Sequence, residues 1–230
     1  MPMLRMHEYP DFASLSDALS ALWLDIIQAK AAGSFALAGG TTPAPVYRKL
    51  DALLAALPVT SGANIKLVAT DERWVGDADP QSNEGLFRQC LEKSNHDVQR
   101  WQLVSLKTSA AAPSEAIPAV AGRLAEQLPN AFDAILLGMG ADGHIASLFP
   151  GSPQLLVNDP ASLCVPATHP QSGQTRISLS LSRLLDTERI WLVITGKEKR
   201  QVLEAAATGG LPIGALLREA TCAIDVFWSP

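Results

Sequence analysis

The chain has 230 residues, of which 47% are hydrophobic and 18% are charged, enough to bury one sizeable core. Its net charge of −5 argues against nucleic acid or an anionic membrane as a general partner, because both are bound through a basic surface. We therefore expect one domain over residues 1–230, with no nucleic-acid and no membrane partner.

Cysteine use and the N-terminus indicate the cytoplasm. The three cysteines, Cys90, Cys164 and Cys222, form no C-x-x-C pair, so a disulfide framework is not expected. The first residues lack the apolar segment of a secretory signal. No apolar run approaches the ~18 residues that span a bilayer. We expect a cytoplasmic protein.

Helix and strand patterns alternate along most of the chain. Helical spacing of apolar residues predicts helices over 14–32, 46–57, 83–93, 114–128, 198–207 and 213–219. Apolar runs and alternating patterns predict strands over 35–38, 65–69, 101–106, 132–137, 177–181, 190–195 and 222–227. Asp11 or Ser14 is expected to cap the first helix. This alternation predicts an α/β fold with a mainly parallel sheet and helices on both faces.

The first polar loop after a predicted strand is Gly39-Gly40-Thr41-Thr42-Pro43. Glycine allows close approach of backbone N–H groups to a ligand, a threonine can cap the following helix, and Pro43 suits its first turn. Free N–H groups and the positive end of a helix dipole favour a phosphate. The same residues also fit a plain strand-to-helix turn, and the motif alone leaves both interpretations open.

The second loop, residues 70–74, follows the strand predicted over 65–69. Arg73 can donate two parallel hydrogen bonds to phosphate or carboxylate oxygens. Asp71 and Glu72 can orient it or bind sugar hydroxyls. A solvated loop with surface ion pairs is the alternative.

The third loop lies in the segment 132–150, FDAILLGMGADGHIASLFP, and contains Asp142 and His144. Residues 138–143 match the G-x-G-x-x-G pattern of dinucleotide-binding loops, which requires a long helix directly afterwards. Pro150 leaves room only for a short helical turn, so the sequence argues against a dinucleotide site.

His144 is the candidate catalytic base, because an imidazole with an unperturbed pKa of about 6.5 accepts a proton at cellular pH. Asp142 either fixes its tautomer or shapes the loop, and backbone N–H groups of the glycine loop are candidates for stabilising an oxyanion. The four histidines are dispersed, so no metal site is expected. Ser147 lacks the G-x-S-x-G setting of a serine nucleophile.

In order along the chain, these motifs resemble the 6-phosphogluconolactonase family. They are LAGGTTP at 37–43, TDERWV at 70–75 with SNEGLF at 82–87, LLGMGADGHIASLFPGS at 136–152, RISLSL at 176–181 and the G-x-x-K of 196–199. The broader relatives are glucosamine-6-phosphate deaminases. The resemblance implies a Rossmann-like three-layer α/β/α fold of the NagB/RpiA/CoA transferase-like type, with no cofactor.

The implied reaction is hydrolysis of 6-phospho-D-glucono-1,5-lactone to 6-phosphogluconate, in the oxidative pentose phosphate pathway. By this resemblance His144 activates water for attack on the lactone C1 carbonyl, and a proton later goes to the ring oxygen. The Gly39–Thr42 loop would hold the phosphate, with charge from Arg73 and Lys199. The expected substrate-binding residues are Gly39, Gly40, Thr41, Thr42, Asp71, Arg73, Arg176 and Lys199. The sequence leaves monomer and homodimer open.

Two alternatives are separated by particular residues. The deaminases read D-G-H-I-A-F-N-E-P, and here Phe149 replaces their catalytic glutamate, which favours the lactonase. A non-catalytic sugar-phosphate sensor would leave Asp142 and His144 without a role. Lys197 does not occupy the lysine position of G-x-x-K and is expected in solvent.

Overall fold

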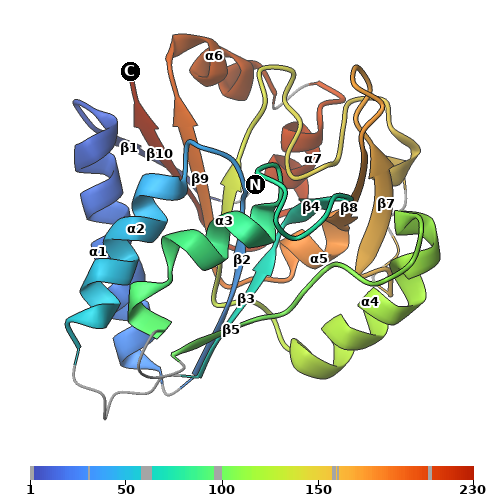
Figure 1. Ribbon diagram of the computed structural model, residues 1–230. Helices are drawn as coiled ribbons and strands as arrows, with labels where there is room; N and C mark the ends of the chain where they lie inside the picture. Colours follow the sequence, from blue (N-terminus) through green and yellow to red (C-terminus); the bar gives the residue numbers. More distant parts are fainter. Residues whose placement is uncertain are drawn as a thin grey trace.

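A seven-stranded parallel sheet forms the centre of the described part of the protein (Figure 1). The computed structural model describes residues 3–30, 32–57, 64–95, 100–156, 159, 161–206 and 209–230. The strand order is β1-β10-β9-β6-β2-β3-β5. These strands are β1 (Leu4–Glu8), β10 (Ile224–Ser229), β9 (Ile190–Thr195), β6 (Ala134–Gly138), β2 (Ala32–Leu37), β3 (Asn64–Ala69) and β5 (Trp101–Leu103).

Helices flank this sheet, as the alternating pattern predicts. The α-helices are α1 (Phe12–Ala29), α2 (Ala44–Ala55), α3 (Asn83–Cys90), α4 (Pro113–Gln127), α5 (Leu181–Leu185), α6 (Lys197–Ala205) and α7 (Pro212–Glu219), and the short 3₁₀ turns are η2 (Lys93–Asn95) and η3 (Pro153–Leu156). Ala207, which the predicted helix over 198–207 includes, lies outside the described residues. None of the helices in the described ranges is long and apolar enough to cross a membrane.

A second, antiparallel sheet stands beside the main one. It has the order β4-β8-β7, with β4 (Asp71–Arg73), β8 (Thr175–Leu179) and β7 (Cys164–Thr168), and α4 packs against β7 and β8. In the register of β4 and β8, Arg73 lies opposite Arg176 and Asp71 opposite Ser178. Alternate residues of a strand share a face, so these four side chains point to the same side of the small sheet.

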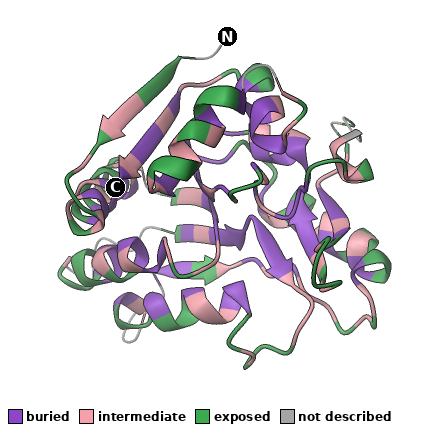
Figure 2. Ribbon diagram, turned by 90° about the horizontal axis from the view of Figure 1, so that it is seen from above, coloured by how far each residue is buried: buried purple, intermediate pink, exposed green. Residues whose placement is uncertain are grey.

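The core follows from burial of the central strands on both faces. The residues of β6 and β9 are almost continuously buried, which explains why their sequences are nearly unbroken apolar runs. Figure 2 shows that buried residues gather in the middle of the molecule. On α1 the inward face carries Leu15, Leu19 and Trp23, and the Asp11 carboxylate caps the helix by accepting from Ser14 N at 2.7 Å. The prediction of an Asp11 cap is confirmed.

Several local predictions were wrong. The helical turn expected after His144 is absent from the described loop, because Ala146 has a left-handed backbone (φ 49°) and residues 145 and 148 form an isolated bridge. The strand expected to reach Leu181 ends at Leu179, since the Ser180 hydroxyl caps α5 by accepting from Arg183 N at 3.1 Å. The helix α2 has Pro43 at its N-cap and no side-chain cap, so neither threonine fills that role.

Three strands were missed altogether. β4 lies in a segment expected to be a loop, β7 in a section expected to be loop-rich, and β1 at the N-terminus.

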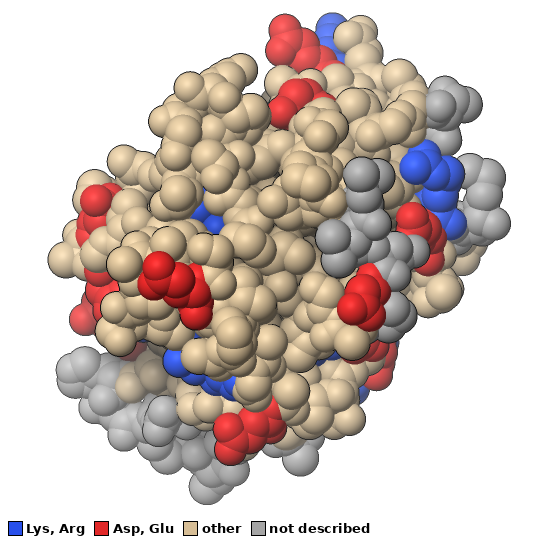
Figure 3. Space-filling view, turned by 90° about the vertical axis from the view of Figure 1, so that its right-hand side faces the viewer, with Lys and Arg blue, Asp and Glu red and all other residues tan. Residues whose placement is uncertain are grey.

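Charged side chains are scattered over the face shown in Figure 3, and the basic residues described there do not gather into a continuous patch.

Candidate active site

A cavity of about 270 Å³ opens where β2, β3, β6 and β9 end at their carboxyl sides. This is where open α/β sheets usually bind ligands. Most of the residues singled out from the sequence line it: Gly39, Gly40, Thr42, Asp71, Arg73, His144, Arg176 and Lys199. Thr41 and Asp142 are both exposed and do not line the cavity; Asp142 contacts His144, which does.

The Gly39–Thr42 loop forms the floor of the cavity between β2 and α2. A Cβ atom on Gly39 would stand 1.8 Å from the Asn83 side-chain oxygen, so only glycine permits this approach. The helix that follows directs the positive end of its dipole toward the loop, and Pro43 has no N–H to leave unsatisfied. The loop therefore suits a bound anion without a threonine cap.

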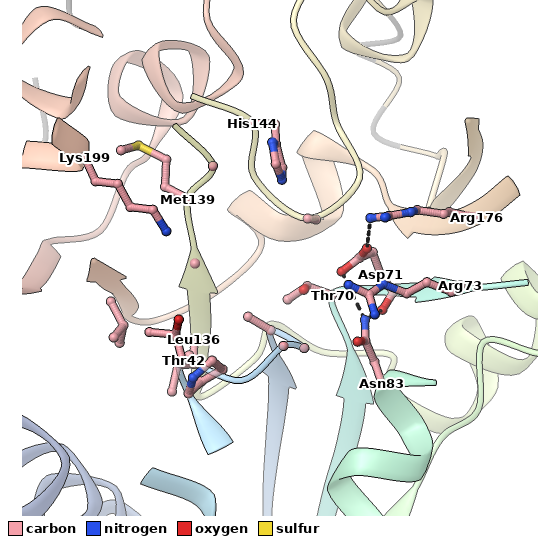
Figure 4. Close-up of a pocket in the computed structure, with 18 residues that line it drawn as sticks. Thr42, Thr70, Asp71, Arg73, Asn83, Leu136, Met139, His144, Arg176 and Lys199 are labelled. Carbon is pink, nitrogen blue, oxygen red and sulfur yellow. Dashed lines mark hydrogen bonds and ion pairs between the residues drawn. The ribbon is translucent and has the colours of Figure 1, made fainter. Parts of the chain in front are cut away.

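The Asp142–His144 pair is built by the glycine loop after β6. The Asp142 carboxylate lies 2.6 Å from the imidazole Nδ1 and accepts from the His144 backbone N–H at 3.2 Å. A Cβ on Gly140 would lie 2.2 Å from the same Nδ1, so Gly140 makes room for the pair. With Nδ1–H donated to Asp142, the lone pair of Nε2 is left for chemistry, and the imidazole points into the cavity (Figure 4).

The charge of Asp142 is maintained by its neighbour. Partial burial on its own would raise the pKa of Asp142, but the hydrogen bonds from the His144 backbone and imidazole outweigh it and lower that pKa. The carboxylate is therefore ionised at neutral pH and holds the imidazole in one tautomer. This geometry supports an orienting role for Asp142.

Two amides of the same loop are already used. Gly140 N donates to the His144 carbonyl at 2.9 Å, and Gly143 N donates to the Gly140 carbonyl at 3.0 Å. Both N–H groups donate to carbonyl oxygens within the loop, so they are not free to donate to a ligand. The expected oxyanion contact does not fit these two N–H groups, and for the other amides of the loop it stays a prediction.

Charged side chains line two opposite sides of the cavity, with His144 between them (Figure 4). We call Thr42, Met139 and Lys199 the lysine wall, and Asp71, Arg73, Asn83 and Arg176 the arginine wall. Lys199 extends from α6, directly after β9. Lys197, two residues before Lys199 on α6, is exposed as expected.

The arginine wall is held by an extensive hydrogen-bond network. The Asp71 carboxylate accepts from Ser147 Oγ at 2.5 Å and lies 3.6 Å from Arg176 Nη1, while Asn83 Nδ2 donates to the Asp71 carbonyl at 2.6 Å. Arg73 donates from Nη1 to the Gln81 carbonyl at 2.7 Å. These bonds connect β4, β8, α3 and the His144 loop.

Glu72 fixes the start of α3 behind this wall. Its carboxylate is fully buried and accepts from Asn83 N at 2.9 Å, Glu84 N at 2.7 Å and Ser82 Oγ at 3.1 Å. A carboxylate at a helix N-terminus satisfies N–H groups that have no partner within the helix. Glu72 is therefore structural, and the sequence-based suggestion that it binds sugar hydroxyls does not fit.

Phe149 connects the histidine to the arginine wall. Its ring centroid lies 5.0 Å from that of His144, 5.2 Å from that of His169 and 5.8 Å from the Arg176 guanidinium carbon. Arg176 thus lies at the same end of the cavity as His144.

Residues of the site that were missed from the sequence include Thr70, Asn83 and Met139, which line the cavity, and Ser147, which bonds to Asp71. Asn83 lies in the SNEGLF motif that had supported the resemblance, and that motif was the available signal. In the described ranges there is no group of three or more His, Cys, Asp or Glu residues that could hold a metal; His96 lies outside them.

Known proteins share both this sequence and this arrangement. The family model described as "Glucosamine-6-phosphate isomerases/6-phosphogluconolactonase" matches residues 12–224. A 6-phosphogluconolactonase of Caulobacter vibrioides is 35% identical, covering 85% of this chain and 82% of that protein. A 6-phosphogluconolactonase of Mesorhizobium japonicum is 33% identical, and the match covers 96% of this chain and 94% of that protein. The crystal structure of a 6-phosphogluconolactonase from Shewanella baltica OS155 superposes with a TM-score of 0.86 at 26% identity, covering 100% of this chain and 98% of that one. The chain belongs to the 6-phosphogluconolactonase family, within the group of glucosamine-6-phosphate isomerases and 6-phosphogluconolactonases.

Proposed function

We propose that this protein hydrolyses 6-phospho-D-glucono-1,5-lactone to 6-phosphogluconate, a step of the oxidative pentose phosphate pathway. The observation that carries the proposal is the Asp142–His144 pair, directed into a cavity with cationic side chains on two sides. The identity of the substrate is taken from the relatives, which are named 6-phosphogluconolactonases.

His144 acts as general base. Its Nε2 takes a proton from water while the water oxygen bonds to C1, and the carbonyl electrons move to the exocyclic oxygen. Collapse of this intermediate breaks the bond between C1 and the ring oxygen, which takes the proton from the imidazolium. The carboxylic acid formed then loses its proton, so lactone and water become a hydroxy-carboxylate and a proton. Asp142 holds the imidazole and stabilises its charged form.

The phosphate is assigned to the lysine wall and the Gly39–Thr42 loop. The N-terminus of α2 and the ammonium of Lys199 are suited to a phosphate dianion. Arg73, which was expected to share the phosphate with Lys199, lies on the opposite wall, so we assign it to the other end of the sugar. Asp71 contributes to that wall by holding Arg176.

The deaminase alternative is less well supported. Ring opening with loss of an amine requires a further acid–base group beside the histidine, and the buried Phe149 ring fills that position.

We further propose that the whole chain works as one catalytic domain, in the cytoplasm, as a monomer or homodimer.

The test is direct assay of the purified protein. We expect 6-phosphogluconolactone to be hydrolysed far faster than in buffer, measured in a pH-stat or by coupling to 6-phosphogluconate dehydrogenase. Unphosphorylated gluconolactone should be a poor substrate through a higher KM. A rate equal to the spontaneous one would show that the proposed function is wrong.

A further inference from the structure

Hydrolysis of a lactone places a negative charge on the carbonyl oxygen of C1, and hydrogen-bond donors aimed at that oxygen usually account for a large part of the acceleration. In this protein the Gly140 and Gly143 amides cannot serve, because both are bonded within their own loop. A side-chain donor at the His144 end of the cavity is the alternative to these amides, and Arg73, Asn83 and Arg176 are donors that line it.

Arg176 is in the right place. Its guanidinium and the His144 imidazole contact the same Phe149 ring, and both side chains line the cavity. The Arg176 side chain is only 11% exposed. A cation so far removed from water interacts more strongly with a developing negative charge than an exposed one does.

Arg176 also has N–H groups that are not fully hydrogen-bonded within the protein. A guanidinium carries five N–H groups. Nη2 donates to Gln174 Oε1 at 3.1 Å, and Nη1 makes only long contacts, at 3.4 Å to Ser147 Oγ and 3.6 Å to Asp71 Oδ2. Nε is buried and has no partner among the described residues. Incomplete pairing leaves this guanidinium with N–H groups that a ligand in the cavity can accept from.

Ser147 holds this guanidinium in position. Its hydroxyl donates to Asp71 at 2.5 Å and faces Arg176 Nη1, and its backbone N–H donates to Ser178 Oγ at 3.2 Å. The left-handed backbone of Ala146 turns the chain so that Ser147 points back toward β4 and β8. Ser147 is itself only 1% exposed, so its position is well determined by packing.

We propose that Arg176 is the catalytic residue that stabilises the oxyanion on C1, and that Ser147 is a positioning residue which fixes Arg176 through Asp71. The inference rests on the proposed function. As water bonds to C1, the carbonyl electron pair moves to the exocyclic oxygen, and Arg176 donates N–H hydrogen bonds to that oxygen. When C1 re-forms its double bond, the ring oxygen leaves and is protonated by His144. No other reactant is needed.

The first test separates kcat from KM. Arg176→Ala should lower kcat by about 10²–10³-fold with KM changed by less than about threefold, and added guanidinium ion should restore part of the lost rate. Arg176→Lys keeps the positive charge and more of the packing, so its kcat should lie between those of the wild type and Arg176→Ala. Thermal unfolding of each variant checks that it is folded. An Arg176→Lys variant with wild-type kcat, or an Arg176→Ala variant that loses only KM and is not rescued, would overturn the proposal.

The second test is a double-mutant cycle. Ser147→Ala should lower kcat about tenfold in the wild type but less than about twofold in the Arg176→Ala background. Ser20→Ala, a similarly buried serine on α1 whose hydroxyl donates to the Asp17 carbonyl, is the control. Equal losses in both backgrounds would show that Ser147 does not act through Arg176. If the wild type itself does not hydrolyse the lactone, the proposed function fails, whereas an active wild type with an unaffected Arg176 variant removes only this inference.

Discussion

The two walls of the cavity are built in different ways. The lysine wall consists of side chains that follow the central strands β2, β6 and β9, and Lys199 reaches it from the first turn of α6. The arginine wall comes from strands β4 and β8 and from Asn83 at the start of α3, and hydrogen bonds and an ion pair at Asp71 connect these elements.

This difference indicates a division of roles. A single flexible cation can follow a phosphate as it enters and leaves, and so contributes mainly to binding. Side chains held by several hydrogen bonds do not need to reorganise during the reaction, which is the condition for electrostatic stabilisation of a transition state. We expect changes in the lysine wall to affect KM and changes in the arginine wall to affect kcat.

The largest effect should come from the group between the walls. His144→Ala should lower kcat by about 10²–10⁴-fold, because the general base is lost while both walls remain for substrate binding. Initial rates across substrate concentrations give kcat and KM, and isothermal titration with 6-phosphogluconate gives the affinity. A near-normal kcat, or loss of product binding with kcat retained, would contradict the role assigned to His144.

Lys199→Ala should raise KM by about 10- to 100-fold with kcat changed little, because one charge-assisted hydrogen bond to the phosphate is lost. Lys197→Ala is the matched control, since it removes the same charge from an exposed position of the same helix. The comparison of walls breaks down if Lys199→Ala lowers kcat instead, or if both variants behave alike.

Glu72→Gln tests whether the buried Glu72 carboxylate stabilises the start of α3 behind the arginine wall. The amide cannot accept all the hydrogen bonds that the carboxylate now receives from the start of α3. Denaturant unfolding should show a loss of about 1–3 kcal/mol in the free energy of unfolding. The exposed Glu198→Gln serves as control. Unchanged stability of Glu72→Gln would mean that α3 does not depend on this carboxylate.

The smallest effect concerns pH and Asp142. Because the pKa of Asp142 is lowered in the folded protein, its contribution to stability is fully present above its ordinary pKa and is lost as pH falls through the lowered value. The difference in unfolding free energy between wild type and Asp142→Asn should therefore shrink as the pH falls below about pH 4. A difference that grows over this acidic range would show that the sign is wrong.

Parts of this site could be predicted because they are local in sequence. Asp142 and His144 are two residues apart on a glycine loop after an unbroken apolar strand, and Lys199 follows another such strand. The chemistry of Asp142 and His144 and their place at the carboxyl edge of the sheet follow from pattern alone, whereas Lys199 was assigned through the family resemblance of its G-x-x-K motif.

The arginine wall could not be predicted in this way. The contact of Ser147 with Asp71 joins residues 76 positions apart, and it depends on the left-handed backbone of Ala146. The opposition of Arg73 and Arg176 depends on the register of two short strands, and the neighbouring strand β7 includes Pro166, which weakens any strand signal. That Thr42 rather than Thr41 faces the cavity is likewise a matter of loop geometry.

The division between the walls is tested most directly by a crystal structure with 6-phosphogluconate bound. We predict that the phosphate contacts the Gly39–Thr42 loop and Lys199, and that the carboxylate lies between His144 and Arg176. The reverse orientation, with the phosphate on Arg73 and Arg176 and the carboxylate beside Lys199, would contradict the account.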